Sequence, residues 1–301
     1  MSLNTSPERV DAMMHLGEAV HEAIDQPVSG VSRAQHILTI GVNSVGSALR
    51  EGVSLDDAGS ELLTIFHDQL NRSGLSINHP VYDAWPQYRS YIQSLPRAPI
   101  LKETGLNHFA SAYGKVIRAT LDNEYYQETN ARHAVHLMGW AVPYAMEYYP
   151  RLNPNRTALK LFFHDGIEAI TQDVPSINLS PEDYEKKVRD EIDALPELQT
   201  MLGAENDRLF DIMRGYEELE EEEDHFSKTA DKLDPGFTHF KTAGYALWSR
   251  HGISSGREFQ AKIDAVTVRI MPYAKDFPIL LRDREELTRR VIEITKWPHD
   301  R

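Results

Sequence analysis

Histidine and aspartate residues near the middle of the chain are spaced as ligands of a metal ion would be. His133 lies in one apolar stretch, and His164 and Asp165 end the next, which runs from Thr157 to Phe163. Imidazole and carboxylate groups together bind divalent cations such as Mn, Co, Fe or Zn, and a chain with no cysteine cannot form a thiolate site. These three side chains are therefore candidate ligands of one ion.

The His164-Asp165 doublet needs a particular local structure. Adjacent residues on a regular helix point about 100° apart, so both can bind one ion only where a helix ends or loosens. Gly166 follows the doublet and permits such loosening. Glu168 lies three residues beyond Asp165, and on a continuing turn its carboxylate looks back toward the ion. There it can take a proton from water or give one to a leaving alkoxide.

Helices are the elements expected to position these residues. Ser6-Pro7-Glu8 is a helix start with serine as the cap, and further helices are expected from about Ser32 to Arg50 and from Ser54 to about Asn71. Pro80 and Pro96 bracket a short aromatic helix. Strand-like alternation is scarce, so we predict an all-α fold.

Later segments are also predicted to be helical. Lys115 to Arg118 belong to a helix, and a helix that starts at the Ser180 cap is interrupted by Pro196. The acidic run from Glu217 to Asp224 is interpreted as a solvated helix face. Two C-terminal helices are expected, from Gly256 to Met271 and from about Leu281 to Trp297.

Composition limits the class of protein. The 301 residues, 41% of them hydrophobic, suffice for one large or two small domains with a sizeable core. A net charge of −14 argues against a broad nucleic-acid surface. No apolar run approaches the roughly 18 residues that span a bilayer, and the N-terminus lacks a signal-peptide pattern. We expect a cytoplasmic protein that binds neither nucleic acid nor membrane.

The candidate ligands also resemble those of a known family. His133, His164-Asp165 and then Asp231 in the phrase SKTADKLD resemble the H…HD…D signature of HD-domain metal-dependent phosphohydrolases. The phrase HDGIEAITQDVP is similar to the HDxxEx(L/I)TGD(L/V)P segment of the 5'-deoxynucleotidase branch. The resemblance covers roughly Lys115 to Leu247. It implies an HD-domain helical bundle over residues 105–255, which leaves an N-terminal helical extension over 1–104 and C-terminal helices over 256–301 packed on the bundle.

The resemblance also implies a fourth ligand. Asp231 is expected to complete the set, with Asp234, one turn later, as the runner-up. His136 lies one turn after His133 on the same helix face and is the alternative to it. No histidine lies between Asp165 and His225, so we expect one ion rather than a two-metal centre.

Two further residues acquire roles from the resemblance alone. Arg118, fifteen residues before His133, is expected to contact the substrate phosphate, the alternative being a surface arginine. Ala119 stands where the family has an aromatic residue, which puts packing against the sugar at that position in doubt. Asp173 is expected to hold the sugar 3'-hydroxyl and so favour deoxyribose, whereas its chemistry alone indicates only an acceptor near the site.

These features predict a phosphohydrolase that uses one divalent ion, Mn, Co, Fe, Zn or Mg, to remove phosphate from a nucleotide. The expected substrate is a deoxynucleoside 5'-monophosphate. One alternative is triphosphohydrolase action on a dNTP. The other is a regulatory HD protein that binds nucleotide without turnover. The added helices would complete the core or form a homodimer interface.

The N-terminal extension contains an echo of the candidate site. His36 precedes His67-Asp68 by 31 residues, the interval that separates His133 from the second doublet. No glutamate follows three residues later. We interpret the echo as coincidence or as a degenerate repeat that holds no metal.

Overall fold

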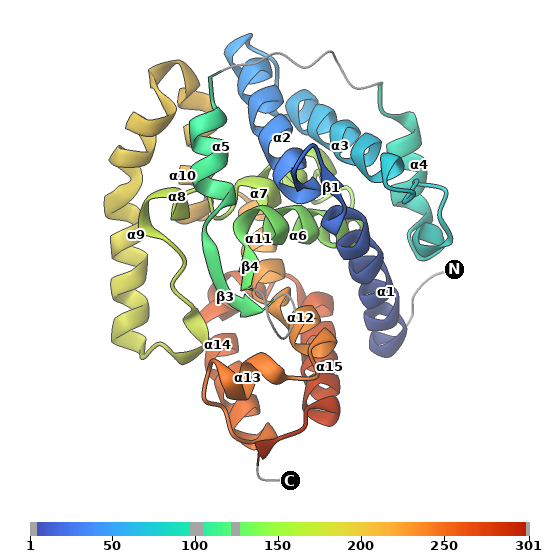
Figure 1. Cartoon of the computed structure of the whole chain (residues 1–301), viewed down its shortest axis with the longest axis vertical. Helices are drawn as coiled ribbons and strands as arrows, with labels where there is room; N and C mark the ends of the chain where they lie inside the picture. Colours follow the sequence, from blue (N-terminus) through green and yellow to red (C-terminus); the bar gives the residue numbers. More distant parts are fainter. Residues whose placement is uncertain (1–4, 97–104, 122–126, 299–301) are drawn as a thin grey trace.

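The computed structural model describes residues 5–96, 105–121 and 127–298, and these form an almost wholly helical protein (Figure 1). The all-α class predicted from the sequence is confirmed, since the described strands form two short antiparallel pairs. One pair is β1 (Pro27–Val28) with β2 (Val31–Ser32), and the other is β3 (Ile117–Leu121) with β4 (Gln127–Thr129).

The N-terminal helices lie together on one side of the molecule (Figure 1). They are α1 (Ser6–Asp25), α2 (Arg33–Arg50), α3 (Leu55–Arg72) and α4 (Pro86–Ser94), with a 3-10 turn at Pro80–Ala84. Ser32 and Ser54 cap α2 and α3 through side-chain hydrogen bonds. The cap of α1 is Thr5 rather than the predicted Ser6, because the Thr5 hydroxyl accepts from the Glu8 amide.

The central pair of helices is α6 (Asn130–Ala145) and α7 (Pro154–Phe163). Every residue of α6 is buried, which requires packing on all sides. Helix α3 approaches α7 so closely that a Cβ on Gly59 would lie 2.2 Å from the carbonyl oxygen of Asn155. Apolar side chains of α1, α2 and α3 share one hydrophobic core with those of α6 and α7.

The segment Lys115 to Arg118 is not helical, which corrects the prediction made from the sequence. Helix α5 (Asn107–Gly114) ends before it, and Ile117–Leu121 form strand β3 paired with β4. Along β3, Ile117 is exposed whereas Arg118 and Thr120 are buried. The sequence shows no alternation of apolar and polar residues here, because the two buried residues are polar and line the site cavity instead of joining the core.

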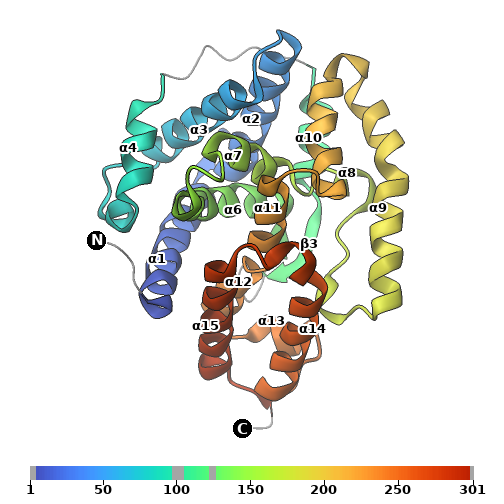
Figure 2. The same ribbon diagram turned by 180° about the vertical axis from the view of Figure 1, so that it is seen from behind.

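The remaining helices surround the site and form the C-terminal end of the molecule. They are α8 (Glu168–Thr171), α9 (Pro181–Leu202), α10 (Asp207–Glu218), α11 (Glu222–Asp231), α12 (Pro235–Lys241), α13 (Tyr245–Ser249), α14 (Gly256–Ala274) and α15 (Pro278–Ile294). Helices α12 to α15 gather at the C-terminal end of the molecule, below β3 in both views (Figures 1 and 2). Within the described residues, no helix is both long and apolar enough to cross a membrane.

Two prolines expected to end helices lie inside them instead. Pro196 is within α9 and Pro272 is within α14. Each proline and the residue four positions earlier, Ile192 or Val268, are exposed, so water can bind the carbonyl that loses its partner. Helix α15 likewise begins and ends about three residues earlier than predicted.

The acidic run Glu217 to Asp224 is not one solvated helix face, which corrects another prediction made from the sequence. Leu219 adopts a left-handed conformation with φ 55° and ends α10, and α11 begins three residues later. Asp224 is fully buried, and its carboxylate lies 2.8 Å from Lys160 Nζ. Tertiary pairing with a lysine of α7 therefore outweighs the local preference of this acid for water.

Candidate metal centre

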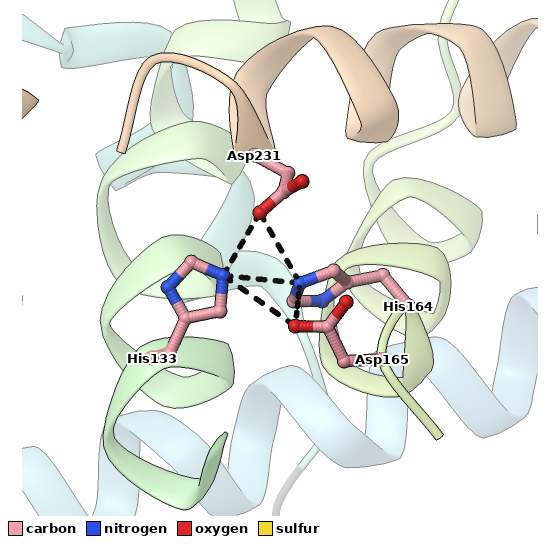
Figure 3. Close-up of side chains that lie close together, drawn as sticks. All are labelled: His133, His164, Asp165 and Asp231. Carbon is pink, nitrogen blue, oxygen red and sulfur yellow. Dashed lines mark hydrogen bonds and ion pairs between the residues drawn. The ribbon is translucent and has the colours of Figure 1, made fainter. Parts of the chain in front are cut away.

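Four side chains from three segments meet at one point inside the molecule. His133 and His164 direct their Nε2 atoms at each other, 3.1 Å apart. Asp231 Oδ1 lies 3.0 Å from the first nitrogen and 3.6 Å from the second. Asp165 Oδ2 lies 2.9 Å from His164 Nε2 and 3.8 Å from His133 Nε2. Figure 3 shows all four side chains pointing toward a common centre.

These separations match those between the ligands of one small cation. Ligand atoms about 2.1 Å from an ion are about 3.0 Å apart at right angles and about 3.4 Å apart in a tetrahedron. The four donor atoms all lie within 4.8 Å of one another. The residues therefore fit a divalent metal with two nitrogen and two oxygen ligands.

Hydrogen bonds on the far side of each imidazole fix which nitrogen carries a proton. His133 Nδ1 lies 2.9 Å from Asp234 Oδ2, and His164 Nδ1 lies 2.8 Å from the Leu161 carbonyl oxygen. An ionised carboxylate and a carbonyl only accept, so each Nδ1 donates and each neutral ring presents a lone pair at Nε2. Two such lone pairs 3.1 Å apart repel unless a proton or a cation lies between them.

The local sequence places the two histidines on facing helices. His133 is in the first turns of α6, whose cap is the Thr129 hydroxyl. His164 is the C-terminal cap of α7, so the doublet lies where a helix ends. Gly166 is needed for space rather than for an unusual φ, since a Cβ there would lie 2.2 Å from Met213 Sδ. Asp231 is the last residue of α11.

Charge interactions outweigh burial at the two aspartates. Burial raises the pKa of Asp231, but Lys232 and the two histidines hold it well below its usual range. Burial likewise raises the pKa of Asp165, but His164 and Arg118 hold it far below the ordinary value. Both groups are therefore anionic, as ligands of a cation must be.

Two buried aspartates in turn determine the direction in which the pKa of His133 shifts. Burial lowers the pKa of His133, but hydrogen bonds to Asp231 and Asp234 reverse this effect and raise the pKa to about 10. In the metal-free protein a proton thus neutralises the cluster, and a binding cation must displace it.

Arg118, on strand β3, lies beside the cluster. Its guanidinium forms an ion pair with Asp165 and lies 3.7 Å from Glu168 and 3.9 Å from Asp231. The residue is buried, so it is not the surface arginine considered as an alternative. Asn130 at the start of α6 accepts a hydrogen bond from it at 3.2 Å.

Glu168, the first residue of α8, is buried on the same side. Its Oε2 accepts a hydrogen bond of 2.9 Å from Asn130 Nδ2. Burial, followed by the charge of Asp165, raises the pKa of Glu168 to about 8. A carboxyl group with a pKa near neutrality can both take and give a proton.

Asp173 lies two residues beyond the end of α8. Its side chain is half-buried, and Oδ2 accepts a hydrogen bond of 2.9 Å from the Ala119 amide. This bond joins the loop after α8 to strand β3. The preceding residue, Gln172, has a φ of 64°, so the chain turns sharply between Glu168 and Asp173.

Asp234 and His136, the alternatives considered for the ligand set, lie behind His133. Asp234 accepts from His133 Nδ1, from His136 Nδ1 at 2.8 Å and from Trp140 Nε1 at 2.6 Å. With Glu128 and His133 it forms a second buried group whose ligand atoms lie within 4.8 Å of one another. His136 stacks on His21, with ring centroids 3.6 Å apart. Asp234 therefore orients His133 from its outer nitrogen.

A cavity of about 120 Å³ opens on the carboxylate side of the cluster. Asp165 and Asp231 line it, whereas the two imidazoles are not among its lining residues. Arg118, Glu168 and Asp173 also line it. Asp165 and Asp231 thus lie between the histidines and the space in which a substrate can bind.

Asn130 and Lys187, which lie near the cluster, were not predicted as site residues from the sequence, whereas Lys232 was considered only as a lysine that could offset phosphate charge. Asn130 hydrogen-bonds to both Arg118 and Glu168, and in the sequence only its position three residues before His133 indicated that it lies near the site. Lys232 Nζ lies 2.6 Å from Asp231 Oδ2. Lys187 reaches the cavity from α9 and carried no motif at all.

The echo in the N-terminal helices has different surroundings. His67 is buried and its Nε2 lies 2.7 Å from the Tyr88 hydroxyl. Asp68 is half-buried and pairs with Arg72 at 2.9 Å. Across the parts of the chain that the structure describes, His36 and this doublet form no group able to hold a metal.

The fold and the site define a helical protein with a buried His/Asp site for a divalent metal. Residues 115–266, half of the chain, match the model of the HD domain family. The chain belongs to this family, and membership together with the site indicates a metal-dependent phosphohydrolase. Comparison with curated proteins and with solved structures gives no match.

Proposed function

We propose that this protein removes the phosphate from a deoxynucleoside 5'-monophosphate, in the manner of the 5'-deoxynucleotidase branch of HD phosphohydrolases. One observation carries the proposal. The two carboxylate ligands, Arg118, Glu168 and Asp173 all face one cavity. A cation site, a buried guanidinium, a proton-transferring acid and a hydrogen-bond acceptor are the groups that hydrolysis of such an ester needs.

The charge of the cavity favours a monophosphate over a triphosphate. Its lining holds four carboxylates and four cationic side chains, which are Asp165, Glu168, Asp173, Asp231, Arg118, Lys187, Lys232 and Arg284. Glu168 can accept a proton only in its ionised form, and in that form these charges balance, so a divalent ion leaves a net charge of about +2. A phosphate monoester carries a charge of about −2 at neutral pH, and a triphosphate carries more.

Each residue has a role that follows from its position. His133, His164, Asp165 and Asp231 would hold a divalent ion, which would supply Lewis-acid polarisation of a phosphate oxygen and a lower pKa for water. Arg118 can move from its carboxylate partners to a phosphate oxygen, where its planar guanidinium donates two hydrogen bonds. Glu168, with its raised pKa, takes the proton of the attacking water or returns one to the leaving oxygen.

Asp173 is proposed to recognise the sugar. Its carboxylate faces the cavity on the side of the Ala119 backbone, and the small Ala119 side chain leaves room beside it. One oxygen already accepts from the Ala119 amide, so the other can accept from a sugar 3'-hydroxyl. Asp173→Asn keeps an oxygen for that amide, and we expect it to lower activity on deoxynucleotides.

Phosphate release measured with each dNMP in the presence of Mn or Co tests the proposal. Release of inorganic phosphate from dNMPs, with little release of pyrophosphate or triphosphate from dNTPs, is the expected result. Turnover of dNTPs alone would indicate a triphosphohydrolase. Tight nucleotide binding without any turnover would indicate a regulatory HD protein.

A further inference from the structure

The cavity continues away from the metal ligands into an apolar lobe formed largely by the C-terminal helices. We call C-terminal lobe the part of the cavity lined by Leu233, His239, Phe259, Arg284, Leu287 and Val291. Helix α15, which supplies the last three, lies wholly beyond the segment that matches the family model. This wall is therefore a feature of this chain in addition to its HD domain.

The hydrophobic residues around the lobe do not form one continuous core. Leu233 and Leu287 belong to the main cluster, whereas Phe259 and Val291 belong to a second one and Val266 belongs to a third. A domain usually has one contiguous apolar core with smaller satellite clusters beside it. Here the cavity lies among the three clusters, and its volume is several times what one water needs.

Two polar atoms in the wall are buried without a hydrogen-bond partner among the described residues. They are Arg284 Nη2 and His239 Nδ1. The other nitrogens of Arg284 do have partners, since Nε donates to the Lys232 carbonyl oxygen at 3.2 Å and Nη1 donates to Thr267. A buried donor without a partner is costly, so a ligand that supplies an acceptor would stabilise this arrangement.

The lobe is directly connected to the metal site. Lys232, whose carbonyl accepts from Arg284, also places its Nζ 2.6 Å from Asp231 Oδ2. A molecule with its phosphate at the cluster can therefore extend its other end past Lys232 into the lobe. There the other end of the molecule would meet an apolar surface, the ring of Phe259 and the buried guanidinium of Arg284.

We propose that the C-terminal lobe binds the nucleobase of the substrate. This inference rests on the proposed function. It assigns recognition of the base, which stays on the sugar when the phosphate is removed, to the C-terminal lobe. A nucleobase has apolar faces that suit Phe259, Leu287 and Val291, and polar edges with acceptors that suit Arg284 Nη2. His239 is neutral, because burial lowers its pKa to about 3, so it adds a hydrogen-bonding group without adding charge.

Matched substrates and matched variants test the lobe. A dNMP and 2-deoxyribose 5-phosphate share the sugar and the phosphate, but only the dNMP has a base. Val291→Phe fills the lobe, and Val268→Phe places the same ring on an exposed position of α14 that does not line the cavity. We expect Val291→Phe to lower kcat/KM for the dNMP about tenfold and leave the base-free ester unchanged, as loss of one stacked base predicts.

A second pair of variants covers the possibility that the larger side chain prevents folding. Leu287→Ala enlarges the lobe, whereas Leu280→Ala creates a cavity elsewhere on the same helix. Only the first should weaken dNMP binding. Arg284→Met should also weaken it, and Arg282→Met, at an exposed position two residues earlier, should not.

Binding of the free deoxynucleoside, measured by calorimetry, separates the lobe from the catalytic proposal. If no dNMP is hydrolysed, the proposed function is wrong, yet loss of nucleoside binding in Val291→Phe would still support the lobe. Equal effects of both members of each pair, or equal losses for the dNMP and the base-free ester, would overturn the lobe whatever the activity.

Discussion

Asp234→Asn is the substitution that best tests how the metal site is held. The Asp234 carboxylate accepts three hydrogen bonds, from His133, His136 and Trp140, at 2.9, 2.8 and 2.6 Å. An asparagine has nearly the same shape but only one acceptor oxygen. Its NH2 group must therefore face a nitrogen that donates, and His133 loses the partner that fixes its proton on Nδ1.

The expected effect on metal binding follows from that loss. Removing the outer partner of a metal-binding histidine weakens binding by about 10- to 100-fold, which is about 1.4 to 2.8 kcal/mol. Because Asp234 is not itself one of the four proposed ligands, an excess of metal should restore most of the activity. The measurement is a Mn or Co titration followed by both calorimetry and phosphate release.

Asp283→Asn provides a matched control. Asp283 is also fully buried, and it accepts from Arg9 at 2.7 Å and from the Tyr144 hydroxyl at 2.7 Å, between α15, α1 and α6. Both substitutions should lower the free energy of unfolding by about 3 kcal/mol, because each weakens hydrogen bonds to a buried charge. Only Asp234→Asn should change the metal affinity. Unchanged affinity in Asp234→Asn, or equal loss in both variants, would refute the assigned role.

Three further predictions concern catalysis and stability. Asp165→Asn should lose bound metal and activity together, whereas Glu168→Gln should keep the metal and lose mainly rate, by about 100-fold or more, as metal analysis and phosphate release will show. His67 is buried with its pKa lowered to about 3 by burial, so the unfolded chain takes up a proton below pH 6.5 that the folded protein cannot; between pH 7 and pH 5 the wild type should therefore lose about 2 kcal/mol more stability than His67→Asn does, as measured by urea unfolding. Gly59→Ala should destabilise the fold by about 3 kcal/mol in the same assay, since the added methyl meets the Asn155 backbone, and a wild-type midpoint would show that α3 and α7 pack less closely than described.

The sequence predicted the helical class and the approximate limits of most long helices. Apolar spacing and serine caps at Ser32 and Ser54 are local signals, and local signals are read correctly when packing agrees with them. Strand β3 was missed because its inward residues, Arg118 and Thr120, are polar. The helix breaks expected at Pro196 and Pro272 were wrong because exposed helix faces tolerate an unpaired carbonyl.

For the site, residue chemistry and spacing gave His133, His164 and Asp165, and the resemblance to the HD signature added Asp231. The structure brings these four residues together, and their roles as ligands remain a prediction. Only the tertiary structure decided that Asp234 lies behind His133, that Asn130 connects Arg118 with Glu168, and that α15 forms a wall of the cavity. The physical reason is distance along the chain. Whether a side chain can bind a metal depends on its type, which the sequence gives directly. The residues that hydrogen-bond to that side chain can lie about a hundred positions away, and they come close to it only when the helices pack.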